Sequence, residues 1–543
     1  MGDTGMIMEL LVALGLIALT AMLVLLLRAA VLSCSHRGRA LRGLDFLAYS
    51  IAFGVLALAA LGAAVVSVSY DYQLNAWLLL GISSLLAGAQ WYRNGLLARF
   101  WNRRALGMGE QPVRVWIAMT AWLLMASISM LLTFLPVKMP AELPDGAYVI
   151  KNSHVHVKVQ VMLGGFPADN YIPFVASEYL LRDIPFSEER PLMPGQELAN
   201  RPILMSLVAI PLGAALYAPP RDTGAQPTFK YLGKRWPDVG RFGDDHAYRS
   251  FLAVALLLNA TLLIGLALLL QYFGLRQGYW IAGLLLFLTS PYFVGQTLFV
   301  WPKSLAAFYV LLAGYTLITK QRSGLVGLML VVAYWAHPYA LVFMFSFALY
   351  LLIRERNDMD PRRGLLPFAL VAGAGVLAWR AWAGWYLQIP ADLIEQNLAI
   401  DAPLLHQLYV RLINCLNTIV PFDLAAGSFP GDLMQMSLLG LVGGVGVFFL
   451  PQALLGSMLC VRRQPTGFLV LVVLPAAAII TVFGELAVPA LHGLQAVTVT
   501  LLVLSLYWMQ QKGKMRWMVL CVCLQVIFNS ALFLQRGHAL MHG

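Results

Sequence analysis

An ionisable cluster lies in an otherwise apolar part of the chain, in the stretch LPDGAYVIKNSHVHVKVQV, residues 143–161. Its first member, Asp145, stands a few residues after the predicted end of an apolar segment and is followed by Gly146. A carboxylate at that place could act as a general base toward a hydroxyl group at the lipid boundary. The alternative is a plain turn, since Pro-Asp-Gly is favourable turn sequence.

The segment HVHVKVQV alternates strictly, so that in a strand His154, His156 and Lys158 share one face and the valines the other. In a helix, His154 and Lys158 would lie one turn apart. This basic face could bind a phosphate group, or it could be a solvated surface. Two histidines spaced by one residue could also chelate a metal, but no third ligand is evident, and we expect no metal site. Asp169 and Glu178 are further carboxylates of the same region, with acceptor-binding or secondary roles.

Four more basic groups stand near the ends of apolar segments: Arg201, Lys303, His337 and Arg380. Ionisable groups at membrane depth are costly and usually line a cavity or a path. The alternative for Lys303 and Arg380 is that each side chain snorkels to the interface. Cations gathered at one level of the membrane suit an anionic lipid head group such as a phosphate.

The elements that must position these groups are membrane helices. The chain has 543 residues, of which 60% are hydrophobic and 12% charged, about half the charged fraction of a soluble domain. We predict an all-α polytopic membrane protein, because apolar windows long enough to cross a bilayer recur along it. The net charge of +11 comes mainly from short loops that set orientation, and it does not indicate nucleic-acid binding. The five cysteines show neither metal spacing nor a disulfide framework.

About fourteen spans are predicted: 6–32, 44–67, 74–92, 114–136, 251–274, 279–298, 302–319, 323–337, 338–353, 364–387, 435–459, 467–485, 490–509 and 516–535. The positive-inside preference places the basic loops in the cytoplasm if segment 202–218 lies in the outer interface without crossing. Regions 137–250 and 388–434 are then external. Three parts are expected: an added N-terminal transmembrane module (1–113), a catalytic core (114–387) whose external loop carries interfacial helices, and a C-terminal part (388–543).

The chain resembles the GT-C superfamily of glycosyltransferases over roughly residues 115–355. The resemblance rests on the order of LPDGAYV, NRPILMSLVAIPLGAAL, LTSPYFVGQTLFVWPKSLAAFYVLLAGYTLI and GLVGLMLVVAYWAHPYALVF. These look like segments of the lipid A aminoarabinose and protein mannosyltransferase branches, and an arabinofuranosyltransferase-like activity also fits. Many relatives place an Asp where this chain has Lys303, which puts a second catalytic carboxylate in doubt.

The resemblance implies inverting transfer of a sugar from a polyprenyl-phosphate donor on the periplasmic face of a bacterial inner membrane. Asp145 would be the catalytic base, and Arg201 would contact the donor phosphate together with Lys303, His337, Arg380 and Lys158. No metal or other cofactor is implied. The acceptor would be a glycan, a lipid or a pilin-like protein. A lipid-linked sugar flippase or transporter, and an O-antigen ligase or polymerase, are the alternatives.

Overall fold

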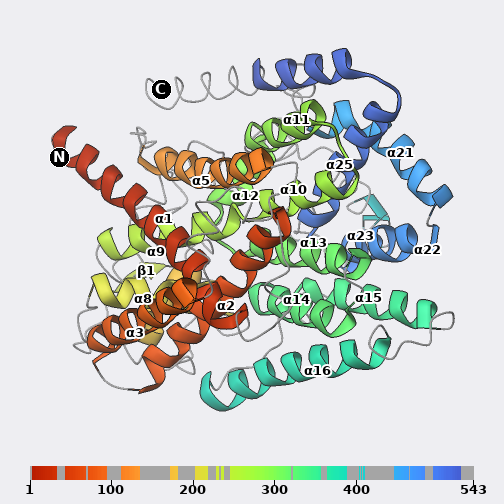
Figure 1. The fold of residues 1–543 in the computed structure, drawn as a ribbon. Helices are drawn as coiled ribbons and strands as arrows, with labels where there is room; N and C mark the ends of the chain where they lie inside the picture. Colours follow the sequence, from red (N-terminus) through yellow and green to blue (C-terminus); the bar gives the residue numbers. More distant parts are fainter. Residues whose placement is uncertain are drawn as a thin grey trace.

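The protein is described by a computed structural model, and the part of the chain that it describes is helical apart from one β-hairpin (Figure 1). The residues that the structure describes are 3–32, 43–68, 71–93, 112–134, 172–181, 202–217, 228–231, 234–237, 245–319, 322–355, 364–387, 403, 405–406, 408–409, 445–463, 465–482 and 493–527.

The first half of the chain contributes the helices α1 (Asp3–Leu32), α2 (Gly43–Val68), α3 (Tyr72–Arg93), α5 (Pro112–Phe134), α7 (Ile172–Leu181), α8 (Leu204–Leu216), α9 (Asp245–Asn259) and α10 (Leu262–Tyr272). The next helices are α11 (Gln277–Leu288), α12 (Pro291–Leu298), α13 (Lys303–Thr319), α14 (Ser323–Ala336), α15 (Ala340–Glu355) and α16 (Leu365–Trp382), which the π-helical turn η5 (Ala383–Leu387) extends. The last are α21 (Val445–Arg463), α22 (Pro465–Phe468), η7 (Leu469–Val473), α23 (Leu474–Val482) and α25 (Gln495–Gln511).

The helical character predicted from the sequence is confirmed, and several long apolar helices are compatible with an integral membrane protein. Within the described residues, five helices are long and apolar enough to cross a bilayer: Ile7–Leu27, Gly43–Ser67, Val113–Thr133, Ala247–Tyr272 and Leu365–Trp385. A bent pair, Gln277–Leu288 with Tyr292–Leu298, makes a sixth candidate. Several predicted spans correspond to shorter apolar helices, among them Lys303–Thr319 and Ser323–Ala336. The number of fourteen spans therefore stays a prediction.

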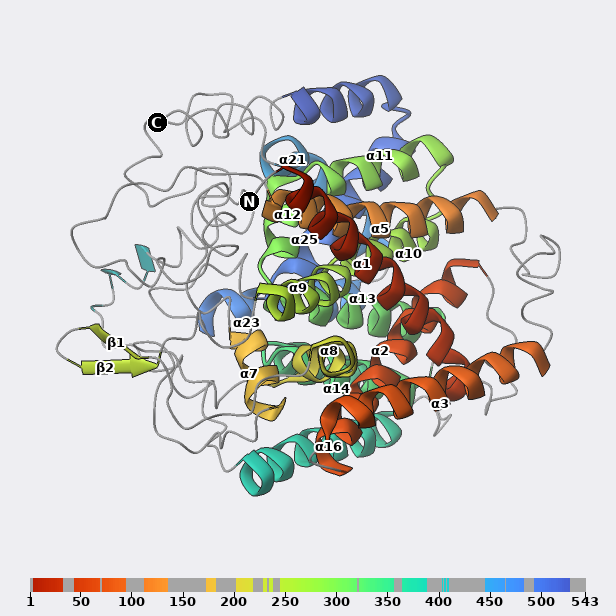
Figure 2. The same ribbon diagram turned by 90° about the vertical axis from the view of Figure 1, so that its left-hand side faces the viewer.

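Two details differ from the sequence-based expectation. The predicted single span 279–298 is bent by 56° between α11 and α12, where Ser290 and Pro291 stop one helix and start the next. The all-α prediction also missed the antiparallel hairpin of β1 (Thr228–Tyr231) and β2 (Lys234–Pro237). Its strands are rich in residues that favour extended backbone, such as the paired Phe229 and Trp236. The hairpin projects at the left of the helical body in Figure 2, beyond α7.

Helix α2, near the N-terminus, packs directly on α13. Three hydrogen bonds join α2 to α13: Tyr309 donates to the Ala52 carbonyl at 2.7 Å, Tyr315 donates to Asp45 at 2.5 Å, and the Tyr49 and Thr316 hydroxyls lie 2.6 Å apart. The predicted N-terminal module thus shares one core with α13. Whether 1–113, 114–387 and 388–543 are separate functional parts remains a prediction.

Close helix packing depends on small residues, as is usual where both helix partners and lipid are apolar. A Cβ at Gly54 of α2 would overlap the Val24 carbonyl of α1, and one at Gly375 of α16 would overlap the Val331 side chain of α14. At the second contact, the Trp335 indole also donates to the Gly375 carbonyl at 3.0 Å. The α14–α16 pair therefore holds the end of α14 in a fixed place.

Candidate functional site

The break between α12 and α13 is the centre of the candidate site. Residues 299–302 interrupt the helix, and Phe299 has extended backbone. The fully buried Asn259, at the end of α9, points its Nδ2 at three carbonyl oxygens of this segment: Phe299 at 2.9 Å, Trp301 at 3.2 Å and Thr297 at 3.4 Å. Non-helical backbone at membrane depth persists only where its polar groups are satisfied by the protein. Asn259 supplies those donors and so fixes the shape of the break.

Lys303 begins α13 immediately after this break, and its side chain is only 2% exposed. Its Nζ lies 4.3 Å from the ring centroid of Trp301 and 4.8 Å from that of Phe299. Both distances are within the range of cation–π attraction, which partly compensates the loss of water around an ammonium group. The break thus places the rings of Phe299 and Trp301 next to the ammonium group of Lys303, which follows them in the chain.

The turn between α14 and α15 brings His337 to the same place. The His337 ring centroid lies 5.8 Å from that of Trp301 and 5.0 Å from that of Tyr339. The Tyr339 hydroxyl donates to the Lys303 carbonyl at 2.8 Å. Lys303 and His337, predicted from sequence to belong to one site, therefore both lie next to the Trp301 ring.

A small cavity, with free volume of ≈ 20 Å³, opens beside this group. That is room for about one water molecule. The helices α7 and α8 form its other wall, and they are tied together by the Ser206 hydroxyl, which donates to the Pro173 carbonyl at 2.6 Å. The lining comprises Ile172, Pro173, Ala176, Pro202, Ile203, Ser206, Trp301, Pro302, Ala336, His337 and Pro338. Trp301 lines the cavity and Lys303 does not, so the indole stands beside both the cavity and the cation.

The two other predicted residues that the structure describes lie elsewhere. Glu178 is buried in α7, one helical turn beyond Phe174, whose ring packs 5.1 Å from Tyr248 and 5.6 Å from Phe251 of α9. It thus shares the α9 side of α7 rather than the face that lines the cavity. Arg380 is exposed on α16 and lies near Tyr334 of α14. Neither residue lines the small cavity.

Six predicted site residues lie outside the described residues: Asp145, His154, His156, Lys158, Asp169 and Arg201. Their roles stay predictions. Pro202, which directly follows Arg201 in the chain, lines the cavity beside His337.

Sequence reasoning missed Trp301, Tyr339 and Asn259. The signal for Asn259 was present, because a lone amide within the apolar run AVALLLNATLL is costly in lipid unless it has partners. Trp301 and Tyr339 gave a weaker signal, since aromatic residues are common at the ends of membrane helices. Their adjacency to Lys303 and His337 becomes evident only when the two breaks in the chain are brought together.

The described residues hold no group of three or more His, Cys, Asp and Glu side chains that could bind a metal ion. What they offer is a buried cation, an imidazole and aromatic rings, placed at the N-terminal end of α13. That end of a helix carries partial positive charge and favours a bound anion. A buried cation, an imidazole and a helix N-terminus are groups that attract an anion.

No protein-family model, no curated protein and no solved structure matches the chain.

Proposed function

We propose that the chain is a membrane glycosyltransferase that moves a sugar from a polyprenyl-phosphate donor to an acceptor on the external face. The observation that carries the proposal is the buried Lys303, held between Phe299 and Trp301 beside His337. A cation in a dry site interacts with a phosphate far more strongly than a cation in water. This suits an enzyme whose leaving group is a lipid phosphate.

In the proposed reaction, Asp145 takes the proton from an acceptor hydroxyl. The hydroxyl oxygen attacks the anomeric carbon, and the bond from that carbon to the donor phosphate oxygen breaks. The polyprenyl phosphate leaves with the electron pair, and the configuration at carbon inverts. Lys303, with Arg201 and His337, stabilises the charge that develops on the leaving phosphate, since fixed cations in a partly dry site need no reorganisation. Lys158 and Arg380 also contact the donor phosphate in this proposal.

The proposed location is the inner membrane of a bacterium, with the site on the periplasmic side. The acceptor is a glycan, a lipid or a pilin-like protein. Support for the side comes from the basic loops, because the α12–α13 break and the α14–α15 turn lie at the helix ends opposite to Arg322 and Arg354.

The test is an in vitro assay in which purified protein, membranes with acceptors and a radiolabelled polyprenyl-phosphate sugar are combined. Wild-type protein is expected to transfer label to an acceptor and to release polyprenyl phosphate in equal amount. Asp145→Asn should bind the donor nearly as wild type and lose transfer by about 10²–10⁴-fold, the usual contribution of a positioned base. Undiminished transfer by Asp145→Asn would remove Asp145 from the mechanism.

A second candidate is a transporter of a lipid-linked sugar. Transporters often contain broken helices and polar groups at membrane depth, and α11 and α12 form such a broken pair. In addition, the Gln495 amide of α25 donates to Gln296 of α12 at 2.8 Å, in a buried position. The two candidates differ in the assay above, because a transporter would move the intact donor between leaflets and release no free polyprenyl phosphate.

A further inference from the structure

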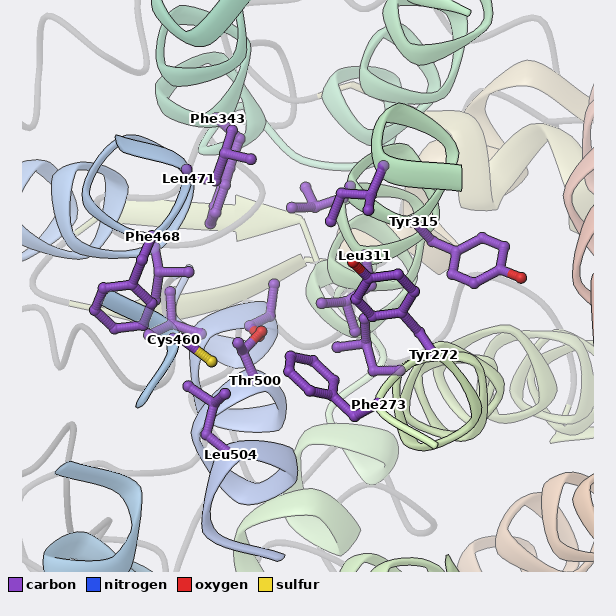
Figure 3. A pocket seen from close by; sticks show the side chains of 18 of the residues that line it. Tyr272, Phe273, Leu311, Tyr315, Phe343, Cys460, Phe468, Leu471, Thr500 and Leu504 are labelled. Atoms are coloured by element: carbon purple, nitrogen blue, oxygen red, sulfur yellow. The ribbon is translucent and has the colours of Figure 1, made fainter. Parts of the chain in front are cut away.

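A second, larger cavity of ≈ 390 Å³ lies inside the bundle between α10, α13, α15, the α22–η7 segment and α25 (Figure 3). Its size is within the usual range of small-molecule pockets. The side chains that line it are apolar or aromatic apart from the Thr500 hydroxyl and the Cys460 thiol. Figure 3 shows these two groups directed toward the same space, near Phe468. The interior therefore suits a hydrocarbon chain better than a sugar or a phosphate.

The cavity has one tyrosine-bearing end. Each of the four helices α10, α13, α15 and α25 contributes one tyrosine from its C-terminal half: Tyr272, Tyr315, Tyr350 and Tyr507. The lining also includes residues from the N-terminal halves of these helices, such as Phe343 and Ala496. Along α25 the lining runs from Ala496 to Tyr507, which is about 17 Å of helix. This length is close to half of the roughly 30 Å hydrocarbon core, the depth that one lipid chain fills.

Basic residues follow the tyrosines on the same side of the molecule. Exposed side chains there are Arg276 after α10, Arg322 after α13, Arg462 in the last turn of α21 and Lys512 after α25. Asp45 is a carboxylate at this level, and it is buried and accepts the hydrogen bond from Tyr315. Glu355 ends α15 on this side. Among the described residues, the charge beyond the tyrosine end is therefore predominantly positive.

We propose that this cavity binds one acyl chain of an anionic phospholipid of the leaflet on the basic side, with its head group among Arg276, Arg322, Arg462 and Lys512. Tyrosines at the level of the head groups are typical of membrane interfaces, and basic residues beyond them attract anionic lipids. The lipid enters from the side of the bundle, where Tyr272 is 38% exposed and Phe468 is half-buried. The site is distinct from the α12–α13 break, and it does not depend on the proposed transfer reaction.

The first test fills the cavity. A Cβ at Gly314 would lie 3.7 Å from the Phe347 ring, an ordinary contact, so Gly314→Leu adds a side chain to the cavity without a backbone clash. The control is Gly373→Leu, at an exposed position of α16 with nothing within 4 Å of a Cβ. Each protein is reconstituted in nanodiscs of equal phosphatidylglycerol and phosphatidylcholine, re-extracted in detergent, and weighed by native mass spectrometry. Wild type and Gly373→Leu should retain one phosphatidylglycerol, which Gly314→Leu should lose.

The second test removes the charges on the exposed surface, where folding is not at risk. Neutralising Arg276, Arg322, Arg462 or Lys512 singly to Gln should weaken phosphatidylglycerol retention by about fivefold each, which corresponds to about 1 kcal/mol per basic residue near anionic lipid. Arg93→Gln, on α3, is the matched control because α3 contributes nothing to the cavity lining.

A third measurement reports occupancy directly. In a protein that keeps Cys460 as its sole cysteine, a membrane-permeable maleimide should label the thiol several-fold more slowly in phosphatidylglycerol nanodiscs than in phosphatidylcholine nanodiscs. Equal labelling in both lipids, or unchanged retention in Gly314→Leu, would overturn the proposal. Retention of a polyprenyl phosphate in place of phosphatidylglycerol would also overturn it, and would assign the cavity to the tail of a glycosyl donor.

Discussion

Lys303 is the residue on which the proposed donor site depends most. Lys303→Met keeps a long side chain between Phe299 and Trp301 but removes the charge. We expect it to weaken binding of polyprenyl phosphate by about 1.5–3 kcal/mol, the scale for a hydrogen bond to a charged group, while Lys303→Arg restores part of it. Titration with the lipid phosphate in detergent measures this. The control is Lys514→Met, which changes an exposed lysine beyond α25, and equal affinities of both Met variants would remove Lys303 from the site.

Asn259 is expected to matter for stability rather than for ligand contact. Asn259→Leu preserves volume but leaves the Phe299, Trp301 and Thr297 carbonyls without their amide donor. Each buried polar group that loses its partner costs about 1–3 kcal/mol. The variant should unfold at a clearly lower temperature. Thr20→Val is the control, because Thr20 donates only to the Leu16 carbonyl within its own helix, and a similar loss in both variants would contradict the role given to Asn259.

At the scale of elements, the α14–α16 contact positions the turn that carries His337. Gly375→Leu forces a side chain into Val331 and should cost at least about 1–3 kcal/mol through overpacking. The shift should also loosen the hydrogen bond from Trp335 to the Gly375 carbonyl. Thermal unfolding and the near-ultraviolet tryptophan signal measure the two effects. Gly373→Leu, two residues earlier on the exposed side, should leave both unchanged.

Helix positions could be predicted from the sequence far better than helix faces. The predicted spans 302–319, 323–337 and 338–353 correspond closely to α13, α14 and α15. Long apolar runs indicate the helices, and the polar residues between the runs indicate where each helix ends. The sequence of a helix such as α16 does not show which of its faces points into the protein. Its residues are apolar all round, and lipid and protein interior are equally apolar surroundings. Arg380 was therefore expected at the cavity, whereas it lies exposed beside Tyr334.

The candidate site, too, could be predicted only in part from the sequence. Lys303 and His337 could be grouped because both stand at ends of consecutive apolar segments, which must meet at one side of the membrane. The role of Trp301 could not be foreseen, since the segment that carries it is held by Asn259 of another helix. Glu178 was chosen for its type alone, and its side of α7 is set by the packing of Phe174 on α9.

At the scale of the whole molecule, the threading through the membrane is the prediction to test. In a cysteine-free protein, Lys514→Cys lies at an exposed position between basic residues and should not react with a membrane-impermeant maleimide added to intact cells. Ser187→Cys, in the predicted external loop 137–250, should react. Breaking the cells should make both positions reactive. Labelling at Lys514→Cys from outside would reverse the orientation and with it the periplasmic location of the proposed site.

Every residue from 251 to 270, in the span formed by α9 and α10, is buried inside the protein, and this has a consequence for the biosynthesis of the span. Its partner α25 begins at Gln495, 223 residues after Tyr272, so at about 5–20 residues per second it emerges from the ribosome roughly 10–45 s later. During that interval, lipid must cover the face of α10 where Phe273 later packs 5.3 Å from Tyr507. Docking of α25 then displaces that lipid, and the cavity beside Tyr507 is where one chain of it would be retained.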